Sequence, residues 1–192
     1  MKNVKFMSSM PSTVGSKLDA ILEIPYIRRT RRNHGLEHAT IHMLSALPRP
    51  VLLSGRSDAS GFVLIGEANA AQVEQAVALA LSRMRGGEHG LAIHPNCGTA
   101  FLTAGFMVTG AAWLGSLGVR RGARDYVDRL PFVLILSVLG LIAAQPLGLK
   151  LQERVTTLGD PGDLEVLNVR QSKVTVPGGG TMTLHRVTTR SS

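Results

Sequence analysis

The stretch LPFVLILSVLGLIAAQPLGL, at residues 130–149, decides the fold because it runs for twenty residues without a charged side chain. An α-helix of about 20 apolar residues is long enough to cross the hydrocarbon core of a bilayer. A second stretch, GTAFLTAGFMVTGAAWLGSLGV at residues 98–119, is also free of charge. We therefore expect two transmembrane helices, and Pro131 near the start of the second one costs little there.

The connector between the two stretches, GVRRGARDYVDR, is short and polar. Such a connector makes the helices antiparallel neighbours, so the chain on both sides of the hairpin lies on one side of the membrane. Small residues recur along both helices and allow close backbone approach; they are Ala111, Gly115, Gly140, Ala144 and Gly148. The alternative is a hairpin buried inside a soluble protein.

The expected location is the cell membrane, with two spans. Arginines in the connector favour a cytoplasmic connector by the positive-inside tendency. Against this, the first residues lack the apolar core of a secretory signal, and the single cysteine suits a reducing compartment. We expect cytoplasmic tails.

The formal charge of +8 is concentrated in two arginine clusters, whereas aromatic residues make up only 4% of the chain. The clusters consist of Arg28, Arg29, Arg31 and Arg32, and of Arg120, Arg121, Arg124 and Arg129. A nucleic-acid surface needs stacking aromatics among its basic residues, so we expect no nucleic-acid partner. Membrane lipids with anionic headgroups are the expected partner, and a solvated basic face is the alternative.

The polar parts predict an α+β fold, a small split α/β domain interrupted by the two-helix transmembrane hairpin. The expected segments are an N-terminal amphipathic and basic segment (1–30), an α/β domain with a histidine helix (31–97), the hairpin (98–150) and a C-terminal β-hairpin (151–192) that completes the sheet. The expected helices are a short one that begins near Ser16 and ends at Pro25, one at 34–47 capped by Asn33, and one at 69–87. The expected strands are 51–55, 61–68, 90–94, 164–176 and 181–190.

The sequence His34-Gly35-Leu36-Glu37-His38 lies on the second expected helix. Side chains four residues apart project from the same face of a helix, so His34 and His38 can present two imidazoles to one metal ion. Glu37 lies beside them, and the apolar stripe of the helix lies opposite. This spacing predicts a metal site on one face of the helix.

A second polar segment, at residues 87–98, contains Glu88, His94 and Cys97 just before the first apolar helix. All three side chains are zinc ligands in proteins. Three protein ligands with one open position make a hydrolytic site, whereas four close it and make it structural. The alternative is that the histidines form ordinary hydrogen bonds and that the cysteine is a small buried hydrophobic residue.

Two resemblances bear on this site. The HxxEH pattern resembles the inverted-zincin metallopeptidases, which implies zinc ligation by His34 and His38 and a general-base role for Glu37. The chain lacks that family's large two-domain architecture. The segments RRNHGLEHATIHML, SGRSD and GEHGLAIHPNCGT before a hairpin resemble an uncharacterised family of bacterial membrane proteins, a domain of unknown function, over most of residues 28–150.

These observations predict an integral membrane protein with a histidine-based metal site near the bilayer surface. A zinc-dependent hydrolase or peptidase is the enzyme class that such a site would suit. The alternative function is a non-enzymatic membrane assembly or scaffold subunit whose histidines are structural. Its hairpin would then pair with another membrane protein or with a second copy of the chain.

Overall fold

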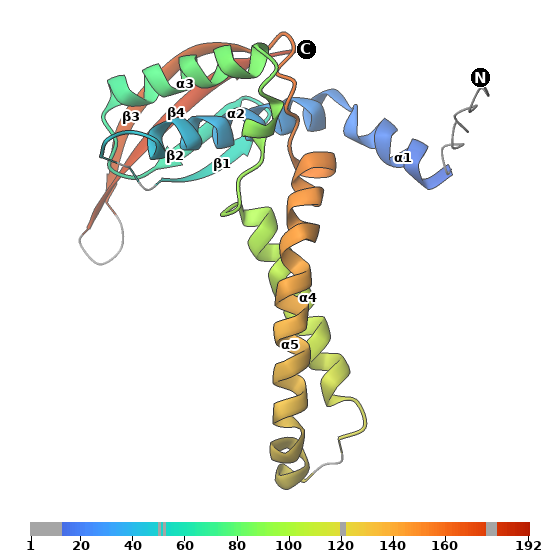
Figure 1. The fold of residues 1–192 in the computed structure, drawn as a ribbon. Helices are drawn as coiled ribbons and strands as arrows, with labels where there is room; N and C mark the ends of the chain where they lie inside the picture. The colour runs from blue at the N-terminus through green and yellow to red at the C-terminus, as the bar shows by residue number, and fades with distance from the viewer. Residues whose placement is uncertain (1–12, 50, 52, 120–121, 176–179) are drawn as a thin grey trace, which may run out of the picture.

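The computed structural model describes residues 13–49, 51, 53–119, 122–175 and 180–192. A helical hairpin projects from one side of a mixed helix and sheet domain (Figure 1). The expected fold class is confirmed, because the structure is α+β, with a four-stranded antiparallel sheet and two long apolar helices.

The sheet joins strands from both sides of the hairpin. Its strands are β1 (Ser54–Asp58), β2 (Gly61–Ile65), β3 (Glu165–Thr175) and β4 (Thr181–Arg190), in the order β1-β2-β4-β3. The central pair is β2 with β4, where Phe62 lies opposite Val187 and Leu64 opposite His185. The strands that follow the hairpin therefore complete a sheet that begins before it.

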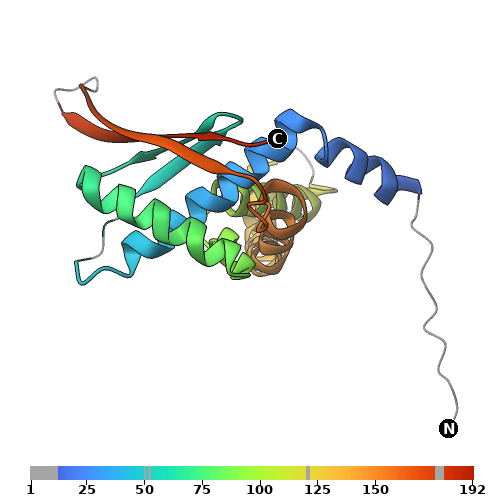
Figure 2. The ribbon, with the colours of Figure 1, turned by 90° about the horizontal axis from the view of Figure 1, so that it is seen from above.

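Helices α2 (Pro25–Ser45) and α3 (Ala70–Arg85) cover one face of this sheet (Figure 2). Side chains alternate along a strand, so every second residue of β2 and β4 faces the helices and is buried. Phe62, Leu64 and Val187 are fully buried there. The α3 helix begins with a capping box between Asn69 and Gln72.

The start of α2 differs from the expectation. Asn33 does not cap the helix, because the helix begins eight residues earlier at Pro25, directly after α1 (Thr13–Leu22), and includes the first arginine cluster. The amide of Asn33 has tertiary partners instead: Nδ2 donates to Asp58 O at 2.8 Å, and Oδ1 accepts from Thr189 Oγ1 at 2.6 Å. These bonds satisfy a polar side chain inside a buried helix.

Two predicted strands also differ. The segment 90–94 is not a strand, since residues His89–Ala92 form a 3₁₀ helix, η1, whose end offers carbonyl groups to histidines of α2. The first strand is Ser54–Asp58 rather than 51–55, so most of the residues expected in the turn pair with β2. Pairing with β2 thus outweighs the local turn propensity of these residues.

The hairpin consists of α4 (Gly98–Ser116) and α5 (Ala123–Leu151), followed by a π-helical turn, η2 (Gln152–Thr156). Its small residues pack the two helices together: a Cβ atom at Gly140 would lie 2.9 Å from Met107 O, and one at Gly148 would lie 3.1 Å from Ala100 Cα. Bulky apolar side chains point outward, and Phe106 is 74% exposed. Both helices are long and apolar enough to cross a membrane. Of the second arginine cluster, Arg120 and Arg121 lie outside the described residues.

Candidate metal centre

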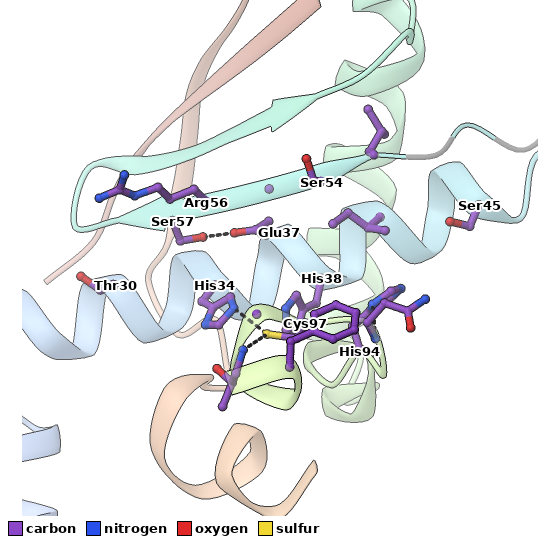
Figure 3. A pocket seen from close by; sticks show the side chains of 17 residues that line it. Thr30, His34, Glu37, His38, Ser45, Ser54, Arg56, Ser57, His94 and Cys97 are labelled. Atoms are coloured by element: carbon purple, nitrogen blue, oxygen red, sulfur yellow. Dashed lines mark hydrogen bonds between the residues drawn. The ribbon is translucent and has the colours of Figure 1, made fainter. Parts of the chain in front are cut away.

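Helix α2 presents His34 and His38 toward Cys97, which lies at the start of α4 (Figure 3). The two histidines are four residues apart and so share a face. One ligand atom from each of the three residues lies within 4.8 Å of the others. His34 Nε2 is 3.4 Å from Cys97 Sγ. This group has the composition and spacing to hold a metal ion.

The outer nitrogen of each of these imidazoles is held by a backbone carbonyl. His34 Nδ1 lies 2.9 Å from Thr156 O, in η2, and His38 Nδ1 lies 2.7 Å from Ala92 O, in η1. A carbonyl oxygen only accepts, so each Nδ1 carries the hydrogen and donates it. In the neutral form of each ring, Nε2 then keeps the lone pair that a metal ligand requires.

Cys97 combines burial with groups that stabilise a thiolate. Its side chain caps α4, and Sγ accepts from the backbone N–H of Thr99 at 3.4 Å. Burial alone would raise the pKa of the Cys97 thiol, but the imidazole of His38 and the amide of Thr99 outweigh it and hold the pKa below its usual value. The thiolate is the form that binds metals.

Glu37 leaves α2 toward strand β1 rather than toward the sulfur (Figure 3). Its buried carboxylate accepts a hydrogen bond from Ser57 Oγ. Residue 55 has to be glycine for this approach, because a Cβ atom there would overlap the carboxylate. Burial raises the pKa of Glu37, while Ser57 and His34 oppose the rise. Glu37, His34, His38 and Cys97 line one cleft of about 580 Å³.

The other two sequence candidates lie outside the three-residue group. Glu88 is exposed and forms an ion pair with Arg83, with 2.8 Å between Oε1 and Nε. His94 borders the group, since its ring centroid is 5.8 Å from that of His38 and 4.8 Å from that of His42. Burial, helped by His42 and His38, lowers the pKa of His94 to about 4, so its ring is neutral at pH 7.

Comparison with known families matches residues 29–169 to the family described as a domain of unknown function, DUF6391. The chain belongs to this family. An uncharacterized protein of Picosynechococcus sp. (strain ATCC 27264 / PCC 7002 / PR-6) is 36% identical over 121 residues, which cover 56% of this chain and 58% of that protein. The chain therefore spans less than two thirds of the length of this relative. No solved structure matches.

The DUF6391 region contains the three grouped residues and also the groups that hold them in place. Sequence reasoning missed the carbonyl groups of Ala92 and Thr156, because a backbone oxygen leaves no trace in the residue type. It also missed Gly55 and Ser57, which contact Glu37. Gly55 was expected at the end of a strand and Ser57 in the turn after it, so the burial of Glu37 against one continuous strand had no signal.

Proposed function

We propose that this DUF6391 chain is an integral membrane protein whose hairpin spans the bilayer and whose α/β domain lies at the membrane surface. The exposure of the hairpin supports this proposal. Only 11% and 17% of the most apolar windows of the two helices are buried in the protein, whereas a soluble core buries its apolar helices. Lipid chains would cover the outward-facing side chains, such as Phe106 and Ile142.

At the base of the hairpin, His34, His38 and Cys97 bind a zinc ion in this proposal. The convergence of one ligand atom from each of His34, His38 and Cys97 within 4.8 Å is the observation that carries it. Two imidazoles and a thiolate are a ligand set that zinc prefers, and the carbonyl groups behind both rings supply the outer contacts that orient zinc-bound histidines.

The proposed reaction class is hydrolysis. Three protein ligands leave a fourth position open, and the grouped atoms face the cleft that Glu37 also lines. A bound zinc ion supplies Lewis-acid chemistry at that position. Glu37 is the proposed base: it would take a proton from the attacking water as the hydroxyl group joins the acyl carbon, and would return that proton to the leaving oxygen or nitrogen as its bond to the acyl carbon breaks.

A structural zinc site is the second candidate, because His94 lies beside His38 and has a neutral ring. A fourth bond from His94 would close the coordination sphere and leave no room for substrate. In that case the metal would tie α2 to the start of α4, and the protein would serve as a non-enzymatic membrane subunit. The partner of such a subunit would contact the outer faces of the hairpin, since Gly115, Gly140 and Gly148 already pack α4 against α5.

Metal analysis tests the zinc site. The wild-type protein, purified in mild detergent and supplied with zinc, is expected to retain about one equivalent after gel filtration. The double variant His34→Ala/His38→Ala is expected to retain none. His89→Ala is the matched control, because His89 is exposed and not part of the group. Equal retention by the wild type and the double variant would remove the proposal.

Cobalt substitution separates the open site from the closed one. An open position binds acetohydroxamate and shifts the visible spectrum of the cobalt protein, whereas a site closed by His94 does not respond until His94→Ala opens it. Glu37→Gln should keep the metal and abolish hydrolysis if Glu37 is the base. Size measurement in mild detergent shows whether the chain forms the stable assembly that a scaffold requires.

A further inference from the structure

A second hollow continues from the cleft along the hairpin. It has a volume of about 340 Å³ and lies between α4 and α5, on the part of the hairpin next to the domain. Asn96 and Phe101 line both the cleft and this second hollow, which we call the hairpin groove. The two spaces therefore adjoin at these residues, and the ligand group lies on one side of them.

The lining of the hairpin groove is mostly apolar. Ala104 of α4 and Leu141, Ala144 and Leu149 of α5 form its walls. From Leu141 to Leu149 the helix rises about 12 Å, at ~1.5 Å per residue. The groove is thus elongated along α5, and Phe101 and Leu141, which line it, are exposed. A hydrocarbon chain fits this shape and chemistry.

We infer that the ligand of this site is an amphiphile whose hydrocarbon chain lies in the hairpin groove and whose polar head reaches the cleft beside His34, His38 and Cys97. This inference rests on the proposed function. The hairpin groove lies on the proposed membrane segment, so a chain can enter it sideways from the bilayer. The head then meets a cleft that contains ionisable and hydroxyl side chains, such as Glu37, Ser57 and Arg56.

Gln145 supports an amphiphile over a plain hydrocarbon. It is the one polar side chain that α5 contributes to the hairpin groove, within an otherwise apolar run. Polar residues in membrane segments are costly, and they face protein or a cavity and mark substrate pathways. The Gln145 amide can hydrogen-bond to an ester, amide or hydroxyl group near the head of the chain.

The test compares two hydroxamates on the cobalt-loaded protein in nanodiscs of fixed lipid content. Acetohydroxamate reports on the metal alone, and decanohydroxamate adds a chain. Ala104→Phe fills the hairpin groove, whereas Ala143→Phe places the same side chain on the exposed side of α5, away from it. We expect Ala104→Phe to weaken decanohydroxamate about tenfold or more and to leave acetohydroxamate unchanged, because only the chain loses its contacts. Ala143→Phe should change neither.

The outcomes separate the two proposals. If acetohydroxamate binds but Ala104→Phe and Ala143→Phe bind decanohydroxamate equally well, the groove inference is wrong and the metal site stands. If no variant binds metal or either hydroxamate, the zinc proposal fails. A fluorescent polyene fatty acid then tests the groove without metal: binding that Ala104→Phe alone reduces supports a chain site, and binding that no variant alters overturns it.

Discussion

Gly35 shows how one residue of the HxxEH segment serves packing rather than chemistry. A Cβ atom at this position would lie 2.5 Å from Leu158 O and 3.2 Å from Ala92 Cβ. Replacing glycine by alanine inside a helix normally stabilises it by ~1 kcal/mol. Here the overlap with a backbone carbonyl should outweigh that gain, because overpacking a filled site costs ~1–3 kcal/mol.

We therefore predict that Gly35→Ala lowers the thermal unfolding midpoint and the zinc occupancy, since Ala92 and Leu158, which contact Gly35, must shift. Gly90→Ala is the control, because a Cβ atom there meets nothing within 4 Å. Thermal unfolding followed by circular dichroism measures both variants in the same detergent. A Gly35→Ala protein as stable as the wild type would show that the segment 156–158 moves freely.

The Asp58 carboxylate gives the domain a pH dependence of its own. The guanidinium of Arg186 bonds it at 2.7 and 3.0 Å, and this contact, with Ser60, holds the pKa of Asp58 well below its usual range. A lowered native pKa means that ionised Asp58 stabilises the fold above the unfolded pKa of about 3.9 and that this contribution is lost as pH falls below it.

We predict that wild-type stability falls as the pH drops from about 5 to about 2 and that Asp58→Asn falls less steeply. The difference between the two proteins should shrink as the pH approaches 2, because the unfolded chain then takes up a proton that the native carboxylate still resists. Unfolding by denaturant at several pH values measures this. In an Arg186→Gln background the effect of Asp58→Asn should shrink, and an unchanged effect would show that Arg186 is not the partner that matters.

At this scale the sequence predicted which residues could hold a metal but not their arrangement. The spacing of His34 and His38 was sufficient to place two imidazoles on one face. Cys97, His94 and Glu88 stood equal as further ligands, because residue type alone does not say which side chain reaches α2. The three-dimensional path of η1 brings Cys97 to the histidines and leaves Glu88 with Arg83.

Among the elements, the π-helical turn η2 lies in a segment for which the sequence predicted no element. It begins where α5 ends, and it supplies the carbonyl of Thr156 to His34. Arg31 holds this turn in place, since its buried Nη2 atom donates to Arg154 O at 3.1 Å and to Thr157 O at 3.2 Å. Single-turn π-helices are rare in proteins, and those that occur often lie at functional sites.

We predict that Arg31→Met loosens η2 and weakens zinc binding, because two carbonyl groups lose a charged donor and His34 loses its fixed support. Hydrogen exchange should increase at residues 152–157, and zinc affinity should fall about tenfold or more. Arg32→Met is the control, since the Arg32 side chain bonds to Asp163 and Ser192 rather than to η2. Unchanged exchange at residues 152–157 in Arg31→Met would show that Arg31 does not hold η2 in place and would contradict the prediction.

The two apolar helices were the easiest elements to predict, because charge-free length needs no tertiary context. Their small residues also had a readable purpose, the close packing of α4 on α5. The domain helices were harder. The predicted start of α2 relied on Asn33 as a local cap, but the buried partners of that amide lie on Asp58 and Thr189.

The packing of the hairpin leads to a matched pair of variants. Gly140 faces Met107 O at 2.9 Å and Ala111 Cβ at 3.1 Å, as measured from a built Cβ atom, whereas Gly105 faces open space. We predict that Gly140→Val separates the helices and lowers the unfolding temperature in detergent, while Gly105→Val has little effect. Similar losses in both variants would contradict the observed register of α4 on α5.

For the whole molecule, the sheet constrains the topology more strongly than the hairpin does. Antiparallel pairing of β2 with β4 joins a strand before the hairpin to a strand after it. The paired residues are more than a hundred positions apart in the sequence. The sequence predicted this closure because an isolated C-terminal hairpin is marginally stable in water. It could not predict the strand order, which depends on which edge of β2 remains free.

This closure predicts the membrane topology. Residues before and after the hairpin must lie on one side of the bilayer, and the loop between α4 and α5 must lie on the other. We expect the domain in the cytoplasm, since a thiolate ligand such as Cys97 persists in a reducing compartment. In a Cys97→Ser background, single cysteines at the exposed positions Glu74 and Asp160 should resist a membrane-impermeant maleimide in intact cells, while one at Gly122 should react. Different labelling at Glu74 and Asp160 would be incompatible with a sheet built from both halves of the chain.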